Sequence, residues 1–116
     1  MNADVRATRG RVDVPEHNAD LVILGGGSGG YACALRAAEL GMSVVLVEKD
    51  KLGGTCLHWG CIPTKALLHA GEVLDTAHEA GAFGITIGET GYDWTKVQEY
   101  KTQVVTKMFR GLQSLI

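Results

Sequence analysis

The chain has 116 residues, a length that fits one small domain. Hydrophobic residues make up 46% of it and charged residues 21%, proportions that are typical of folded domains and argue against disorder over the whole length. Its 11 basic and 13 acidic residues nearly cancel, which argues against nucleic acid or an anionic membrane as a partner. No apolar run approaches the ~20 residues that span a bilayer. Glycine is unusually frequent, with 16 residues, which indicates close approach of backbone segments.

Residues 1–19 are polar, and we expect them to form a disordered tail. This segment lacks the apolar stretch of a signal peptide, and its acidic residues are untypical of a transit peptide. Three cysteines are too few, and odd in number, for a secreted scaffold held together by disulfides. These features predict a cytoplasmic protein in which residues 20–116 form the folded part.

The first half of the folded part has the pattern of a βαβ unit. Residues 21–24 and 44–47 are short apolar runs, typical of strands that are buried on both faces in a parallel sheet. Between them, the glycine-rich residues 25–30 predict a loop, and the alanine-rich residues 31–40 predict a helix that stops at Gly41. The predicted fold class is therefore α/β, with a Rossmann-like βαβ unit of the kind that binds dinucleotides.

The second half is predicted to be mainly helical. Residues 51–55 form a loop and a long helix follows to about Ala80, with Pro63 interrupting its first turns. Residues 85–87 form at most a short strand, and a further amphipathic helix begins after Asp93, its N-cap. Two strands alone make an unstable sheet. We therefore expect an incomplete domain, either the first part of a larger protein or a chain that needs a partner.

The glycine-rich loop matches the pattern G-x-G-x-x-G at Gly25, Gly27 and Gly30. Glycine at these positions allows a tight turn, close approach of the backbone to a pyrophosphate, and close packing of the helix on the sheet. Glu48 follows the second strand, where a carboxylate accepts hydrogen bonds from ribose hydroxyl groups. The pattern predicts an ADP-containing dinucleotide without distinguishing FAD from NAD. The alternative is a flexible turn beside a solvated Glu48.

Cys56 and Cys61 lie five residues apart at the start of the long helix. In a regular helix such residues point about 140° apart and differ by ~7.5 Å along the axis. A disulfide needs Cα atoms within ~4.4–6.8 Å, so it requires a distorted helix, which Gly60 and Pro63 permit. The helix start also favours thiolates, and Lys65 adds positive charge one turn beyond Cys61.

A redox-active disulfide beside the dinucleotide is the interpretation we favour for Cys56 and Cys61, and two alternatives stay open. One is a zinc site made of Cys56, Cys61, His69 and His78, whose residue types are suitable but whose spacing matches no known pattern. The other is a pair of inert buried thiols. Cys33, among alanines in the first helix, is expected to be a small packed residue.

Residues 53–68, which contain Gly-Gly-Thr-Cys and then Gly-Cys-Ile-Pro-Thr-Lys-Ala-Leu-Leu, closely resemble the class I pyridine nucleotide–disulfide oxidoreductases. The resemblance extends from about Asp20 to the C-terminus. Residues 62–69 are most similar to the lipoamide-oxidising members, since glutathione reductases usually have a second lysine after the proline. His58 and Trp59 depart from the Asn-Val pair that is commonest in this family.

The resemblance implies that the chain binds FAD through the glycine loop and Glu48. It implies that Cys56 exchanges with the substrate, that Cys61 lies against the flavin as the charge-transfer thiolate, and that Lys65 is near the flavin N5. The catalytic residues expected on this basis are Cys56 and Cys61, with no metal. The expected cofactor-binding residues are Gly25, Gly27, Ser28, Gly30, Glu48, Lys49, Gly54, Thr55 and Lys65.

The reaction that the resemblance implies is oxidation of dihydrolipoamide by thiol–disulfide exchange, with electrons passing through FAD to NAD⁺. The implied partners are the lipoyl domain of a 2-oxo acid dehydrogenase complex and, in a full-length protein, a second copy of the chain. Family members also have an NAD domain and an interface domain that donates a His–Glu pair. Neither fits into 116 residues, so we expect little turnover by the chain alone. The alternatives are a mercuric or glutathione-type reductase of the same family, and a non-enzymatic nucleotide-binding or thiol-switch module.

Overall fold

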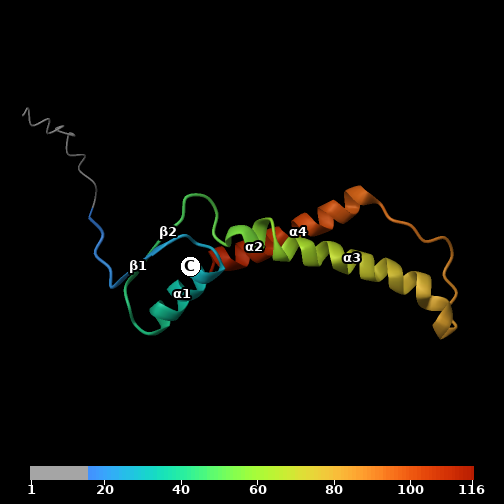
Figure 1. The fold of residues 1–116 in the computed structure, drawn as a ribbon, viewed down its shortest axis with the longest axis horizontal. Coiled ribbons are helices and arrows are strands. Elements are labelled where there is room, and N and C mark those ends of the chain that lie inside the picture. Colours follow the sequence, from blue (N-terminus) through green and yellow to red (C-terminus); the bar gives the residue numbers. More distant parts are fainter. Residues whose placement is uncertain (1–15) are drawn as a thin grey trace, which may run out of the picture.

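The computed structural model describes residues 16–116. The tail expected at residues 1–19 therefore lies mostly outside the described residues, and residues 16–19 have no regular secondary structure. Figure 1 shows a β1–α1–β2 unit and a long hairpin of α3 and α4, which meet around α2. The elements in chain order are β1 (Leu21–Leu24), α1 (Ser28–Glu39), β2 (Val44–Val47), α2 (Gly54–His58), α3 (Cys61–Glu79), the 3₁₀ helix η1 (Ala80–Phe83) and α4 (Trp94–Gln113).

The two strands pair in parallel, as the sequence predicts, with Leu21 opposite Val44. Helix α1 connects the strands and packs against both of them. At the start of the sheet, the Asp20 carboxylate accepts hydrogen bonds from the backbone N–H and the hydroxyl group of Ser43, at 2.8 and 2.7 Å. These bonds join the beginnings of the two strands. The predicted α/β arrangement is confirmed as a helix-connected, two-stranded parallel sheet.

The strands are not buried on both faces, contrary to the prediction. Val22 and Leu24 of β1 are 56% and 83% exposed, and Val47 of β2 is 48% exposed. Within residues 16–116 only α1 packs on this sheet, so the face that carries these three side chains stays open. The apolar runs in the sequence are typical of a larger sheet with helices on both sides.

Helix α1 begins at Ser28 rather than at residue 31, because residues 28–30 already have helical backbone geometry. The end of the glycine loop is therefore the first turn of the helix. At the other end, Gly41 follows the helix with φ +80° and donates a hydrogen bond to the Ala38 carbonyl at 2.9 Å. Gly41 acts as the predicted stop, because glycine adopts this left-handed conformation without steric cost.

The long helix that the sequence predicts between residue 55 and about Ala80 is divided into α2 and α3. Helix α2 has five residues, and Gly60, with φ −124° and ψ −109°, departs from helical geometry before α3 begins at Cys61. A Cβ on Gly60 would lie 3.1 Å from the Thr55 carbonyl oxygen, so a side chain fits poorly at this bend. Pro63 does not interrupt the helix, because it lies in the first turn of α3, where its missing N–H has no helical partner to lose.

Helices α3 and α4 lie side by side as a hairpin, joined by η1 and the irregular residues 84–93 (Figure 1). The short strand considered at residues 85–87 does not form, and Ile85 and Ile87 are 58% and 47% exposed there. No helix within residues 16–116 has both the length and the apolar character needed to cross a membrane. The buried apolar residues are Ala34, Ala37, Leu57, Ala66 and Ala80. Leu57 of α2 is the largest of these, and the other four are alanines of α1, α3 and η1.

The N-cap of α4 gives a test of this hairpin. As predicted, Asp93 is the cap, and its carboxylate accepts hydrogen bonds from the N–H groups of Thr95 at 2.9 Å and Lys96 at 3.3 Å. We expect Asp93→Ala to lower the free energy of unfolding by about 1 kcal/mol, because it removes this acceptor. Asp93→Asn retains an acceptor and should unfold like the wild type. Urea unfolding followed by circular dichroism measures the difference, and equal stability of all three proteins contradicts the capping role.

Candidate functional site

Backbone conformation and close contacts exclude side chains at particular positions of the glycine loop. Gly25 has φ +98°, a left-handed conformation that favours glycine. A Cβ on Gly30 would collide with the Gly25 carbonyl oxygen, and a Cβ on Gly54 would lie 2.8 Å from the Gly27 Cα. The glycines at residues 25, 30 and 54 are therefore required sterically, and the loop is held close to the start of α2.

Glu48 fastens the glycine loop to the end of β2. Its Oε2 accepts a hydrogen bond from the Gly26 N–H at 2.7 Å, and its Oε1 accepts from the N–H groups of Lys49 and Asp50 at 2.7 and 3.1 Å. The hydrogen bonds from Gly26 and Asp50 lower the pKa of the Glu48 carboxyl below its ordinary value, because they stabilise the charged form. This stabilisation is present at neutral pH and is lost as the pH falls through the lowered pKa.

The segment that follows Glu48 returns to the glycine loop. The Gly53 N–H donates a hydrogen bond to the Gly26 carbonyl at 2.7 Å. The Leu52 side chain fills the space beside Gly26, where a Cβ would lie 2.5 Å from the Leu52 Cδ2. Gly53 itself has φ +109°, again in the region that favours glycine. The start of α2, and with it Cys56, is thereby held against the loop.

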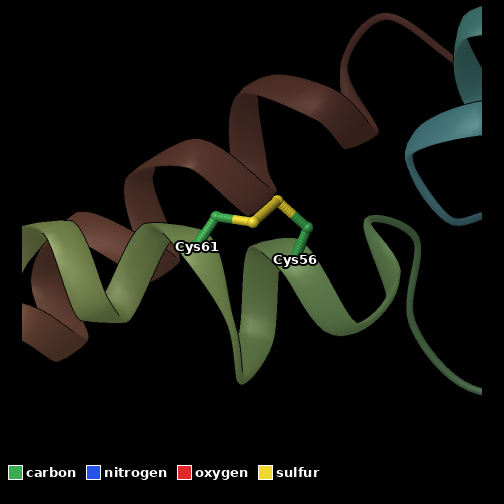
Figure 2. The surroundings of a disulfide bond; sticks show 2 residues. All are labelled: Cys56 and Cys61. Carbon is green, nitrogen blue, oxygen red and sulfur yellow. A yellow bond between two sulfur atoms is a disulfide. The ribbon is translucent and has the colours of Figure 1, made fainter.

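Cys56 and Cys61 form a disulfide across the helix break, with their Cα atoms 4.7 Å apart. Cys56 lies in α2 and Cys61 is the first residue of α3, and Figure 2 shows the sulfur atoms on the side of these helices that faces α4. The distortion that such a bond requires is present, and Gly60 is where it occurs. The disulfide favoured from the sequence is confirmed.

The alternatives for these cysteines do not agree with the structure. The zinc site suggested for the two cysteines and two histidines is not formed, because no three His, Cys, Asp or Glu side chains in the described part of the chain converge to hold a metal ion. Cys61 is exposed and Cys56 is half-buried, so they are not buried inert thiols. Cys33 is exposed as well, and the expectation of a packed residue is wrong, because Ala34 and Ala37 form the buried side of α1.

The other predicted cofactor residues have exposed side chains around the same junction. Ser28 begins α1, Lys49 follows β2, Thr55 lies in α2, and Lys65 lies one turn beyond Cys61 in α3. Within residues 16–116 none of these four side chains makes a hydrogen bond or an ion pair. Their donors are therefore available to a ligand, and their cofactor contacts stay a prediction.

Sequence reasoning missed the structural part that His58 plays. Its Nε2 lies 2.8 Å from the Leu52 carbonyl oxygen, and its ring packs edge-on against Phe109 of α4, with ring centroids 5.1 Å apart. The signal in the sequence that could have indicated this role was the position of His58 between the two cysteines. Gly26 was missed too, because it occupies a position that the pattern G-x-G-x-x-G leaves free, and Gly53 was noted only as part of the family resemblance.

A pocket of about 400 Å³ opens beside Cys56. Four helices, α1 to α4, contribute side chains to its mainly apolar lining, and Lys107 is its one charged residue. The side chains that line it besides Cys56 include Tyr31, Leu57, Ile62, Lys107, Met108 and Leu112. A larger pocket, of about 630 Å³, lies farther along the α3–α4 hairpin and does not include the disulfide. Of these two pockets, only the smaller one is lined by Cys56.

Several curated proteins are similar to this chain. The dihydrolipoyl dehydrogenase of Bacillus subtilis (strain 168) is 54% identical over 97 residues, that of Zymomonas mobilis 45% over 97, and that of Staphylococcus aureus 44% over 97. Each match covers 84% of this chain and 20 or 21% of the relative. The chain therefore spans about a fifth of the length of these relatives.

A family model described as pyridine nucleotide-disulphide oxidoreductase matches residues 19–114. The matched residues contain both the parallel βαβ unit with its glycine loop and the Cys56–Cys61 disulfide. The glycine loop contacts Gly53 and Gly54, directly before the helix that carries Cys56, so the loop and the disulfide lie in neighbouring segments of the matched region. The chain belongs to the pyridine nucleotide-disulfide oxidoreductases, a family of enzymes.

Proposed function

We propose that this chain is the FAD-binding, disulfide-bearing part of a dihydrolipoamide dehydrogenase. The observation that carries the proposal is the contact between the two sites: the Gly53 N–H, three residues before Cys56, donates to the Gly26 carbonyl of the glycine loop at 2.7 Å. A disulfide that exchanges electrons with a cofactor has to lie beside it, and this contact supports such an arrangement. The similar Bacillus subtilis protein is named dihydrolipoyl dehydrogenase, which supports the substrate.

The glycine loop fits the pyrophosphate of FAD. A Cβ on Gly27 would meet only the Gly54 Cα, at 4.0 Å, so this side of the loop is open to the close approach of phosphate oxygens. The first N–H groups of α1 lack partners within the helix and, with the helix dipole, attract anions. The Glu48 carboxylate keeps lone pairs beyond those used by its backbone hydrogen bonds, and these can accept from ribose hydroxyl groups.

Ser28, Lys49, Thr55 and Lys65 complete the proposed cofactor site. Ser28 and Thr55 offer hydroxyl groups on the two sides of the loop contact, and both are exposed. The Lys65 ammonium group lies one turn beyond Cys61, where its positive charge stabilises a nearby thiolate. When bound, FAD supplies two-electron chemistry between the dithiol and NAD⁺.

The Cys56–Cys61 disulfide performs the substrate half of the proposed reaction by thiol–disulfide exchange. A thiolate of dihydrolipoamide attacks the Cys56 sulfur, the bond between the cysteines breaks, and Cys61 leaves as a thiolate. The second substrate thiolate then attacks the mixed disulfide, so that lipoamide closes and Cys56 is released as a thiolate. The substrate has lost two electrons to the cysteine pair and two protons to solvent or a base.

The pocket beside Cys56 supports an aliphatic substrate. Its lining is mainly apolar, with Lys107 as its one charged residue. The hydrocarbon arm of a lipoyl group suits such a lining, whereas each half of glutathione disulfide carries two carboxylates and an ammonium group that would need polar partners. The pocket therefore favours dihydrolipoamide over glutathione, and it favours Cys56 as the cysteine that meets the substrate.

For the whole protein we propose NAD⁺ as the final electron acceptor and the lipoyl domain of a 2-oxo acid dehydrogenase complex as the partner that presents the substrate. We also propose a homodimer, in which a second copy supplies the base for the dithiol, in the cytoplasm. These assignments rest on the names of the similar proteins and on the sequence resemblance. Reduction of Hg²⁺ or glutathione disulfide by the whole protein instead would assign it to another branch of the family.

FAD binding tests the glycine loop. Gly30→Ala places a methyl group against the Gly25 carbonyl oxygen, and we expect it to weaken FAD binding by roughly tenfold or more. Gly29→Ala is the matched control, because a Cβ at residue 29 meets nothing within 4 Å. Quenching of flavin fluorescence on titration with each protein gives the Kd values. Equal affinity of the two variants, or tighter binding of NAD than of FAD, contradicts the proposal.

The two cysteines should differ spectroscopically in the FAD-loaded protein. Cys56→Ser leaves the Cys61 thiolate beside the flavin, and we expect a long-wavelength charge-transfer absorption band. Cys61→Ser removes that thiolate, and the band should be absent. Cys33→Ser is the control, because Cys33 is exposed on α1 and outside the disulfide, and its spectrum should match the wild type. The opposite pattern would mean that the roles of the two sulfur atoms are exchanged.

Reduction of the disulfide by substrate tests the pocket. Leu112→Glu places a negative charge in the apolar lining, and we expect reduction by dihydrolipoamide to slow by roughly tenfold. Leu68→Glu is the control, since Leu68 of α3 is 62% exposed and lies outside this pocket. Alkylation of the freed thiols followed by mass spectrometry gives the rates. Equal slowing in both variants shows that the pocket does not receive the substrate.

A further inference from the structure

The turn that carries the disulfide, residues 56–61, depends on tertiary contacts for its shape. Helix α2 has five residues, and neither α2 nor α3 has a side-chain hydrogen bond at its N-cap. A helix of this length is not stable by itself in water. Gly60 adds backbone freedom in the middle of the turn. A contact outside the turn is therefore needed to keep Cys56 within reach of Cys61.

His58 makes such a contact. Its Nε2 lies 2.8 Å from the Leu52 carbonyl oxygen, and because a carbonyl oxygen only accepts, Nε2 carries the proton of this hydrogen bond. The ring also packs against the rings of Phe109 and Trp59, with centroids 5.1 and 5.4 Å away. The side chain is half-buried, which limits competition from water for the hydrogen bond.

The Leu52 carbonyl belongs to a peptide unit whose N–H is bonded to the glycine loop. That N–H is the Gly53 N–H, which donates to the Gly26 carbonyl at 2.7 Å. The Gly26 N–H in turn donates to Oε2 of Glu48 at 2.7 Å. Three hydrogen bonds thus connect the His58 ring with the Glu48 carboxylate. Bonds at the two ends of one peptide unit polarise and strengthen each other.

We propose that His58 is a positioning residue for the Cys56–Cys61 disulfide. Acting through the peptide unit between Leu52 and Gly53, it holds the turn against the glycine loop and keeps the two sulfur atoms in reach of each other. This inference rests on the proposed redox role of the cysteine pair. Without the Nε2–H donor the reduced turn relaxes, and re-forming the disulfide costs more conformational entropy. The thiol–disulfide equilibrium then shifts toward the dithiol.

The test is the equilibrium of the full chain with glutathione, in which the protein disulfide and two glutathione thiols give the protein dithiol and glutathione disulfide. His58→Phe keeps an aromatic ring but removes the donor, and we expect the equilibrium constant for disulfide formation to fall roughly fivefold. His58→Gln keeps a donor and removes the ring, and we expect a change of less than about twofold. The control is His69→Gln, because His69 is exposed on α3 and its ring bonds only Glu72 within residues 16–116.

A merely structural role predicts a different result. If His58→Phe destabilises the oxidised and reduced chains equally, thermal unfolding shifts but the equilibrium constant stays unchanged, and the proposal is overturned. The proposal is also overturned if His58→Gln lowers the equilibrium constant for disulfide formation as much as His58→Phe does. The packing of the ring, and not the hydrogen bond, would then be decisive.

A measurement on the unaltered chain remains decisive where His58→Phe does not fold. The chemical shifts of the histidine ring nitrogens in NMR show which nitrogen carries the proton, and we expect Nε2–H in the oxidised chain. A predominant Nδ1–H form overturns the proposal. Neither experiment requires FAD or dihydrolipoamide. Failure of the proposed function would be seen separately, as absence of FAD binding in the flavin titration.

Discussion

One hydrogen bond, from the Gly53 N–H to the Gly26 carbonyl, sets the distance between the glycine loop and the disulfide turn. It forms because the two backbones meet without side chains: a Cβ on Gly54 would lie 2.8 Å from the Gly27 Cα. The two segments follow neighbouring parallel strands, whose carboxyl ends lie at the same edge of the sheet. The topology of the sheet therefore brings the glycine loop into contact with the segment that leads into the disulfide turn, although the two are far apart in the sequence.

The features that could be predicted from the sequence depend on interactions between near neighbours in the chain. The strands at 21–24 and 44–47 have the predicted bounds, because runs of β-branched and leucine residues identify them. Gly41 and Asp93 end and begin helices for local reasons, a left-handed conformation and a capped turn. The disulfide could be predicted for a similar reason, since the spacing of the cysteines required a bend in the helix and Gly60 could provide it.

The features that could not be predicted depend on which surfaces meet in space. Cys33 is exposed because the buried side of α1 carries Ala34 and Ala37 instead. An alanine-rich sequence does not indicate which side of the helix is buried. The bond of His58 depends on a carbonyl that is placed by a contact with the glycine loop. The exposed face of the strands, with Leu24 83% exposed, reflects how few elements pack on this sheet within residues 16–116. Local patterns contain little information about such contacts.

The open sheet has a consequence for the chain in solution. Val22, Leu24 and Val47 form an apolar strip, and within residues 16–116 each strand has one side with no strand beside it. Unpaired edges of this kind add strands from other chains, and an adjoining apolar strip favours such addition. At high concentration we therefore expect this surface to favour association of chains through β-strand addition. Leu24 and Val47 directly precede Gly25 and Glu48, so Val22 is the position on this strip where solubility can be altered with the least effect on the site.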